Sequence, residues 1–409
     1  MIVPTKIIDE LGARWSDFEA FELTRQDEAV EYGRALSKLA TLSGAEILAL
    51  VGEITAPGAL PTAEVDRYRG LRVPFPATFE HHAAAREWAA GILGQQVVVA
   101  VDGSQIMPLT DSDLPVAAVQ AVWFENHHTL DGRYERQIEF ELLTPRDLQR
   151  SPGTRDDLQT EQLINLRRFE LEMRTLERRL EAIADSIAAS IAHGRGGDGV
   201  EDRLAIGLID SSLVISFAER LADELRPRYT AALLALLRTA ERTGIPVIGY
   251  VDGSRSRDLL NLLAHAFGLT SNPGIDDAQI LDPHLQWGER TPLMVCARGG
   301  SVRGKESILE SLESYRRGIG FVYLKTSRTT PPARLEIPLW VEERGHLDRV
   351  IDLIRAEVIV GNGYPYAIQS ADAAVAISGR DRDQFHAIVA RFASQQGSSA
   401  KRLSKSRRR

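Results

Sequence analysis

The stretch QVVVAVDGS, residues 96–104, constrains the fold of this chain more than any other part of its sequence. Its apolar run is typical of a strand buried on both faces, and an acid, a glycine and a serine follow it. Two more β-rich runs come next, PVAAVQAVWFEN and RYERQIEFELLTP, each reached through a short polar turn. Because short connections favour antiparallel neighbours, these three runs predict a three-stranded meander.

A long amphipathic helix is expected after the meander, over about residues 157–193. Its apolar stripe at helical spacing consists of Leu166, Phe169, Met173, Leu176 and Leu180. Two continuous apolar runs follow, RLAIGLIDSSL and IPVIGYVDGS, with a helical segment between them. This order predicts two buried strands joined by a parallel crossover. The core is expected to close with two helices broken at residues 361–363.

The bulk composition is that of a globular protein, with 409 residues, 44% hydrophobic and 26% charged. No run of 18 apolar residues exists, so no transmembrane helix is expected, and the first residues lack the features of a signal peptide. The only cysteine, Cys296, excludes an internal disulfide and fits a cytoplasmic protein. A net charge of −8 argues against a basic coat, although a local basic groove would suffice for nucleic acid.

Three regions are predicted along the chain. Residues 1–94 read as a mostly helical N-terminal region, and residues 95–395 as the α/β domain. Residues 396–409 form a basic tail, ending in KRLSKSRRR, that is expected to be disordered. We expect the histidine pairs at 81–82 and 127–128 to be solvated, because they show no zinc-ligand spacing.

Acidic residues recur at defined places in this predicted order. Asp102 ends the first strand, Asp210 ends the strand after the long helix, and Asp372 lies on a late helix. One or more glutamates lie on the long helix itself. Three antiparallel strands, a helix and a parallel strand is the order of a ribonuclease H-like fold, in which such acids converge. We therefore expect an α/β protein with a ribonuclease H-like mixed sheet flanked by helices.

Converging carboxylates predict a metal site. Two divalent ions about 4 Å apart need several oxygen ligands to hold them beside a phosphodiester. Hard oxygen ligands favour Mg²⁺ or Mn²⁺. Taken singly, each aspartate has a simpler interpretation, because DG and DSS after a strand are common turns. The tetrapeptide VDGS occurs twice, at Asp102 and at Asp252, and only the ordered set of acids distinguishes the first copy.

Five segments in order make the chain resemble the NurA nuclease family: VAVDGSQI, LIDSSL, IPVIGYVDGSRS, RLEIPLWV and GNGYPYAIQSADAAVAI. Together with the basic end, they span about residue 96 to the C-terminus. The resemblance implies a ribonuclease H-like, manganese-dependent nuclease that acts on DNA ends and on single strands. It further implies a homodimer that works with a hexameric HerA-type ATPase in end resection of double-strand breaks.

The resemblance assigns the catalytic, metal-binding residues Asp102, Asp210, Glu172 and Asp372, holding two Mn²⁺ or Mg²⁺ ions. Glu172 comes from an R-x-x-x-E pattern that begins at Arg168, and Glu170 and Glu177 remain alternatives. Two departures stand out: Ser211 replaces the glycine that usually follows the second aspartate, and Asp372 replaces a late histidine. These departures motivate an alternative function, a non-catalytic DNA-binding subunit of a HerA-type complex.

Four further residues are candidates for contact with DNA: Ser104, Tyr364, Arg255 and Arg257. For Tyr364 the alternative role is that of an aromatic residue at a helix entry, beside Pro365. A third functional class rests on GGSVRGK, which nearly spells a phosphate-binding loop ending at Lys305. The next residue is Glu306 instead of the Ser or Thr that would hold Mg²⁺, so an ATPase is disfavoured.

Overall fold

The computed structural model describes residues 3–109, 114–148, 157–192, 203–270, 274–299, 301–302 and 305–396. These residues fall into two compact units. Unit 1 takes its described residues from Met1–Ala77, Val251–Glu310 and Ser314–Leu339, and unit 2 from Thr78–Tyr250, Ser311–Glu313 and Trp340–Arg409. The predicted boundaries near residues 95 and 395 stay predictions, and the basic tail lies outside the described residues.

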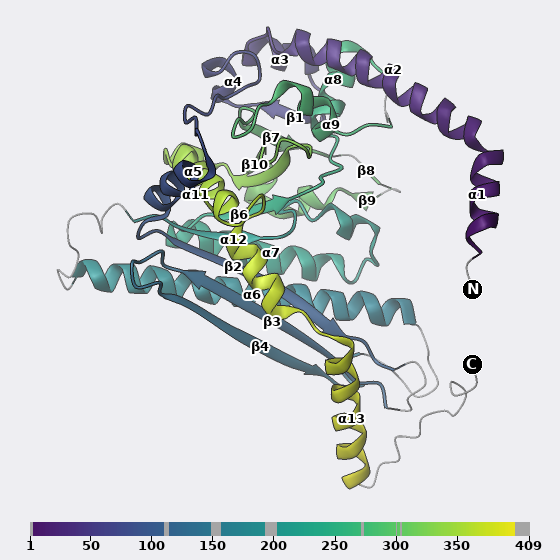
Figure 1. Cartoon of the computed structure of the whole chain (residues 1–409), viewed down its shortest axis with the longest axis vertical. Helices are drawn as coiled ribbons and strands as arrows, with labels where there is room; N and C mark the ends of the chain where they lie inside the picture. Colours follow the sequence, from purple (N-terminus) through teal and green to yellow (C-terminus); the bar gives the residue numbers. More distant parts are fainter. Residues whose placement is uncertain are drawn as a thin grey trace. The chain divides into compact units, whose positions relative to one another are not determined.

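Unit 2 contains the meander that the sequence predicts. Its strands are β2 (Val97–Ile106), β3 (Ala117–Asn126), β4 (Tyr134–Leu143), β5 (Ala205–Ile209) and β6 (Val247–Val251). They lie in the order β6-β5-β2-β3-β4, with β2, β3 and β4 antiparallel and with β5 parallel to both β2 and β6 (Figure 1). This is the strand order of a ribonuclease H-like fold, so the expected fold class is confirmed.

The helices of unit 2 alternate with these strands along the chain or follow them. They are α5 (His82–Leu93), α6 (Asp157–Ala192), α7 (Arg226–Thr243), α10 (Trp340–Glu343), α11 (Leu347–Val360), α12 (Tyr366–Val375) and α13 (Gly379–Gln395), with a 3-10 segment η2 (Ser216–Arg220). The buried side of α6 is the predicted apolar stripe, including Leu166, Leu176 and Leu180, all fully buried. Its burial against β2 and β3 supplies the hydrophobic energy that holds the long helix in place.

Unit 1 has its own strands, β1 (Gly58–Pro61), β7 (Met294–Ala297), β10 (Ile319–Leu324) and β11 (Ala333–Pro338), paired antiparallel in the order β1-β7-β10-β11. Its helices are α1 (Pro4–Ala13), α2 (Trp15–Leu39), α3 (Gly44–Val51), α4 (Ala63–Arg67), α8 (Asp258–Phe267) and α9 (Asp277–Leu281), with a 3-10 turn η3 (Asp282–His284). Buried ion pairs lie within this core, among them Glu64 with Arg290 at 2.7 Å. Within the described residues, no helix combines the length and apolarity needed to cross a membrane.

The pairing of β8 (Ser301–Val302) with β9 (Lys305–Glu306) bears on the sequence that nearly spells a phosphate loop. Val302 pairs with Lys305 and Ser301 pairs with Glu306 in a two-stranded ladder. A phosphate loop would place its lysine at the start of a helix. Lys305 lies in a strand instead, and a 3-10 segment, η4 (Ile308–Tyr315), follows it. The backbone therefore gives no support to an ATPase.

The two copies of VDGS differ in structure. Strand β2 continues through Asp102 to Ile106, and Asp102 lies opposite Val122 on β3. The expectation that Asp102 ends its strand is therefore wrong, because the ladder to β3 keeps the backbone extended for four more residues. Asp252, in contrast, follows β6 in a turn in which Gly253 has a φ of +57°. Only the second copy is a turn that ends a strand.

Candidate active site

Asp102 and Asp210 are neighbours across two parallel strands. Val101 on β2 pairs with Ile209 on β5, so the next residue on each strand is an aspartate. Parallel strands lie about 4.8 Å apart, which brings the two backbones, and with them the acids, close together. Asp102 is half-buried within the sheet and Asp210 is exposed just beyond the end of its strand.

Glu172 lies against the backbone of β2 at Gly103, the residue that follows Asp102. A Cβ atom on Gly103 would lie 2.1 Å from Oε1 of Glu172 and 2.9 Å from Cγ of Arg168. Only glycine therefore lets α6 bring both side chains so close to β2. Arg168 donates a hydrogen bond of 3.0 Å to the carbonyl of Gly103 and lies 3.5 Å from the Glu172 carboxylate.

Asp372 reaches the same neighbourhood from α12. The hydroxyl of Ser104 donates to the carbonyl of Val375 at 2.7 Å, and the Gln120 amide donates to the same oxygen at 3.0 Å. These bonds hold the end of α12 against β2 and β3. Side chains alternate along a strand, so Gly103 faces α6 whereas Asp102 and Ser104 face α12. The exposed side chain of Asp372 lies one turn before Val375.

The pKa of Asp102 reflects the charges of the other predicted acids. Burial raises the pKa of Asp102 above its ordinary value, and the charges of Asp372 and Asp210 raise it further, while the Gly103 amide and Arg168 oppose the rise. Burial also raises the pKa of Glu172, to about 7, with Arg168 lowering it and Asp102 raising it. Asp102 is thus electrostatically coupled to all three of the other predicted acids.

Tyr364 is bonded to one of these acids. Its hydroxyl donates to Oδ1 of Asp210 at 2.5 Å, and its ring packs edge-on against Tyr250 with the centroids 4.9 Å apart. A tight turn positions the ring: a Cβ atom on Gly361 would lie 1.9 Å from the Tyr364 carbonyl oxygen. Tyr364 therefore orients an acid of the site from the segment just before α12.

The rival glutamates on α6 have other partners. Glu170 accepts two hydrogen bonds from Arg228, at 2.8 and 2.7 Å, and Glu177 accepts one from Thr239 at 3.1 Å. Both partners lie on α7. Of the three glutamates, Glu172 is the one that lies against β2, at Gly103.

The remaining DNA-contact candidates are less informative. Ser104 uses its hydroxyl hydrogen on Val375, although its oxygen can still accept a bond. Arg255 is exposed and Arg257 half-buried, and both belong to unit 1, just before α8. The histidines at 127 and 128, expected to be solvated, are 15% and 11% exposed. That expectation is wrong, because His127 pairs with Glu125 and His128 with Glu357.

The chemistry of the acids fits a hard divalent cation. Oε1 of Glu172 is buried and accepts no hydrogen bond from the described residues, which leaves it available as a ligand. No group of three His, Cys, Asp or Glu side chains within the described ranges is close enough, as it stands, to hold an ion. Asp210 and Asp372 are both exposed.

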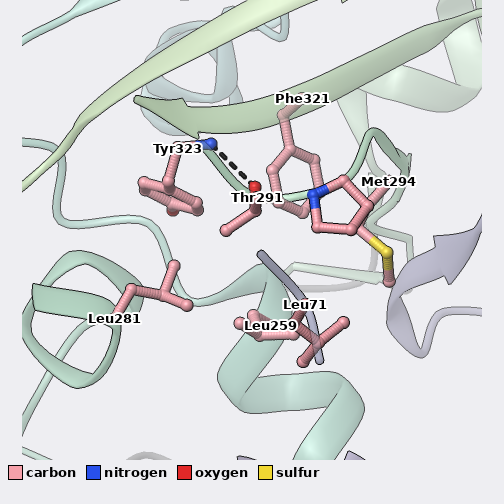
Figure 2. A pocket seen from close by; sticks show the side chains of 8 residues that line it. Leu71, Leu259, Leu281, Thr291, Met294, Phe321 and Tyr323 are labelled. Atoms are coloured by element: carbon pink, nitrogen blue, oxygen red, sulfur yellow. Dashed lines mark hydrogen bonds between the residues drawn. The ribbon is translucent and has the colours of Figure 1, made fainter. Parts of the chain in front are cut away.

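A small cavity in unit 1 offers no competing site. Figure 2 shows its mostly apolar lining, which includes Leu259, Met294 and Phe321, and the hydrogen bond of 2.9 Å from the Tyr323 amide to Thr291. None of its lining side chains is an acid, a histidine or a cysteine. Such a lining supplies no carboxylate, imidazole or thiolate to hold a hard divalent cation.

The strand order and the acids of unit 2 define an α/β protein of the ribonuclease H-like class. The NurA domain matches residues 96–377, more than half of the chain, and the chain belongs to the NurA family. Membership in this family supports a nuclease-type hydrolase. Among curated proteins, none matches the chain.

Solved structures of low sequence identity are also similar. The crystal structure of NurA with manganese is 10% identical, with a TM-score of 0.39, covering 74% of this chain and 89% of that one. The crystal structure of NurA bound to dAMP and manganese is 11% identical, with a TM-score of 0.34 and coverages of 75% and 89%. The catalytic domain of human endonuclease V is 14% identical, with a TM-score of 0.32 and coverages of 82% and 99%.

Proposed function

We propose that this protein is a metal-dependent DNA nuclease, acting as an exonuclease on DNA ends and as an endonuclease on single strands. The observation that carries the proposal is the position of Asp102, which lies next to Asp210 on neighbouring strands and interacts electrostatically with Glu172. Its coupling to the charge of Asp372 supports the fourth member. Family membership supports the same reaction class.

In this proposal, Asp102, Asp210, Glu172 and Asp372 hold the cations, and no covalent intermediate forms on the enzyme. Two Mn²⁺ or Mg²⁺ ions, when bound, would lower the pKa of a water and stabilise the leaving oxygen of the phosphodiester. Asp102 and Glu172 supply carboxylates from a partly dehydrated setting, in which electrostatic attraction is strong. Tyr364 orients Asp210, and Arg168 holds Glu172 against β2.

The wider role follows from family membership alone and forms part of the proposal. We infer a cytoplasmic protein that acts as a homodimer with a hexameric HerA-type ATPase, in DNA repair by resection of double-strand breaks. Ser104, Tyr364, Arg255 and Arg257 remain the candidate DNA contacts.

The test uses end-labelled single- and double-stranded DNA incubated with the protein in Mn²⁺ and in EDTA. The proposal expects cleavage with Mn²⁺, none with EDTA, and a loss in Asp102→Ala of at least about a thousandfold, the scale seen when a central group of a catalytic site is removed. Cleavage by Asp102→Ala at the wild-type rate would show that the assignment is wrong.

The alternative is a non-catalytic DNA-binding subunit. It is motivated by Ser211 and Asp372, the two positions that depart from the family pattern. It predicts no cleavage with any divalent ion, together with stimulation of a HerA-type ATPase when DNA is present. The same preparation serves both assays, so one set of reactions separates the two functions.

A further inference from the structure

The segment that follows Asp210 buries all but one of its large apolar residues. Leu213, Val214 and Ile215 are at most 1% exposed, and Ala218 is fully buried. Phe217 is the largest side chain of the segment, yet 47% of its surface is exposed. A single exposed aromatic residue is common on protein surfaces, so the contacts and the charged neighbours of Phe217 decide what it does.

The exposed ring is held firmly on one side. Phe217 packs edge-on against Tyr229 of α7, with ring centroids 5.3 Å apart, and against Phe169 of α6 at 6.4 Å. Phe169 and Tyr229 are themselves 4.9 Å apart and both are buried. This three-ring cluster fixes the orientation of Phe217 and leaves one surface of it open.

The cluster lies next to the proposed active site. Phe169 precedes Glu172 by three residues, less than one turn of α6, and Phe217 follows Asp210 by seven residues. The charges of Arg168 and Glu172 act on the buried hydroxyl of Tyr229, which places that ring within electrostatic range of the acids. The three rings therefore come from the helix that carries Glu172, from the segment that follows Asp210, and from a tyrosine on which the charge of Glu172 acts.

A positively charged side chain, Arg220, lies close to Phe217 in the sequence. Arg220 is the last residue of η2, three residues after Phe217, and it is exposed. Side chains three residues apart are eclipsed in a 3-10 helix, so Arg220 lies on the same side of η2 as Phe217. An aromatic face for a base and a guanidinium for a phosphate are the two groups that bind single-stranded nucleic acid.

We propose that Phe217 is a stacking platform for one unpaired base of the DNA strand that enters the acid site, and that Arg220 contacts a phosphate of the same strand. The proposal rests on the proposed nuclease function, because its ligand is the substrate of that site. It makes the preferred substrate a strand with unpaired bases beside the bond to be cut.

The experiment measures binding of a fluorescent oligothymidylate in EDTA, where no cleavage occurs, with a single abasic position moved along the oligonucleotide. Stacking on one aromatic ring is worth about tenfold to a hundredfold in affinity for each base. We expect Phe217→Ala to weaken binding of the intact oligonucleotide by about tenfold or more, and Phe217→Trp to retain it. Phe392→Ala, which removes a ring that is 63% exposed on α13, is the matched control and should bind as wild type.

The decisive result is whether the effect of the Phe217→Ala substitution depends on the effect of the abasic position. One abasic position should weaken binding to the wild type but not to Phe217→Ala, because the stacking contact is already absent there. Equal weakening of both proteins at every abasic position overturns the proposal. Loss of a dimer in Phe217→Ala, measured by light scattering, also overturns it and assigns the ring to a protein contact.

A substrate without a base separates this proposal from the nuclease function. An oligodeoxynucleotide made only of abasic positions is a phosphodiester chain without a nucleobase or any other aromatic ring, and the acids alone should govern its cleavage with Mn²⁺. Phe217→Ala should cleave it at the wild-type rate. If wild type cleaves nothing with any cation, the nuclease function fails, and the abasic scan still decides whether a base stacks on Phe217.

Discussion

The hydroxyl of Tyr364 donates a hydrogen bond of 2.5 Å to Oδ1 of Asp210, which links the segment before α12 to the end of β5. The sequence leaves two roles open for Tyr364, contact with DNA and an aromatic residue at a helix entry. The structure gives it a partner in the acid site, and α12 itself begins two residues later, at Tyr366. Groups that hydrogen-bond to a metal ligand fix its orientation and tune its affinity for the metal.

Removing the Tyr364 hydroxyl tests that link. We predict that Tyr364→Phe weakens Mn²⁺ binding by about tenfold to a hundredfold, because Asp210 loses the bond that orients it. Isothermal titration calorimetry of the metal-free protein measures this directly. Tyr366→Phe removes a hydroxyl two residues away and should bind Mn²⁺ as wild type does; equal affinities for all three proteins would contradict the prediction.

Gly103 supplies the space for Glu172. Gly103→Ala places a methyl group 2.1 Å from Oε1 of Glu172, so that side chain must move. We predict a loss of about 1–3 kcal/mol in the free energy of unfolding, together with loss of cleavage. Gly91→Ala in α5 meets no atom within 4 Å and should add about 0.5–1 kcal/mol of stability instead. Chemical denaturation of the three proteins compares them, and a Gly103→Ala protein as stable and active as wild type would refute the packing argument.

The raised pKa of Glu172 predicts how stability depends on pH. Its pKa is about 7 in the folded protein against an ordinary value of 4.5, so between these values the folded state retains a proton that the unfolded chain has lost. The free energy of unfolding of the metal-free protein should therefore fall as pH rises through this window. With 16% of the side chain still exposed, the contribution is on the order of 2 kcal/mol.

Glu172→Gln is the matched variant for this effect, since it has nearly the same shape and does not titrate. Its stability should fall less than that of wild type between pH 4.5 and 7, measured by urea denaturation at fixed metal-free conditions. Parallel curves for the two proteins would show that Glu172 is not a buried titrating group.

Asp372 stands where the family resemblance expects a histidine. Asp372 is an exposed aspartate on α12. Its carboxylate can bind the same divalent metal that a histidine would bind, and it adds a negative charge. We predict that Asp372→His keeps Mn²⁺-dependent cleavage within about tenfold of wild type, whereas Asp372→Ala loses more. A histidine variant as impaired as the alanine variant, in an assay with a single-stranded substrate, would contradict the exchange of one ligand for the other.

The sequence predicts the sheet of unit 2 well because its signals are local. Apolar runs, short turns and the stripe on α6 define the meander, the long helix and the parallel crossover. The sequence misses β1, whose four residues carry too short a pattern. It also misses α13, although Ser378 and Asp381 form a capping box at its start, a signal that can be read from residue type and spacing.

The acid site is predicted only in part, since its geometry depends on contacts between distant segments. Periodicity could not choose among the glutamates of α6, because all three lie at similar offsets from the apolar stripe. The choice depends on Arg228 and Thr239, which donate hydrogen bonds to Glu170 and Glu177. It also depends on Gly103, which has no side chain and leaves space for Glu172. The extension of β2 beyond Asp102 depends likewise on β3, which the residues DGS do not reveal.

Anomalous diffraction from Mn²⁺-soaked crystals of wild type, Asp102→Asn and Asp252→Asn tests the central claim most directly. The account predicts a manganese peak within coordination distance of Asp102 and Glu172 in wild type. The peak should persist in Asp252→Asn and weaken or vanish in Asp102→Asn. A peak that remains at full strength in Asp102→Asn, or that requires Asp252, would contradict the assignment of the first VDGS to the metal site.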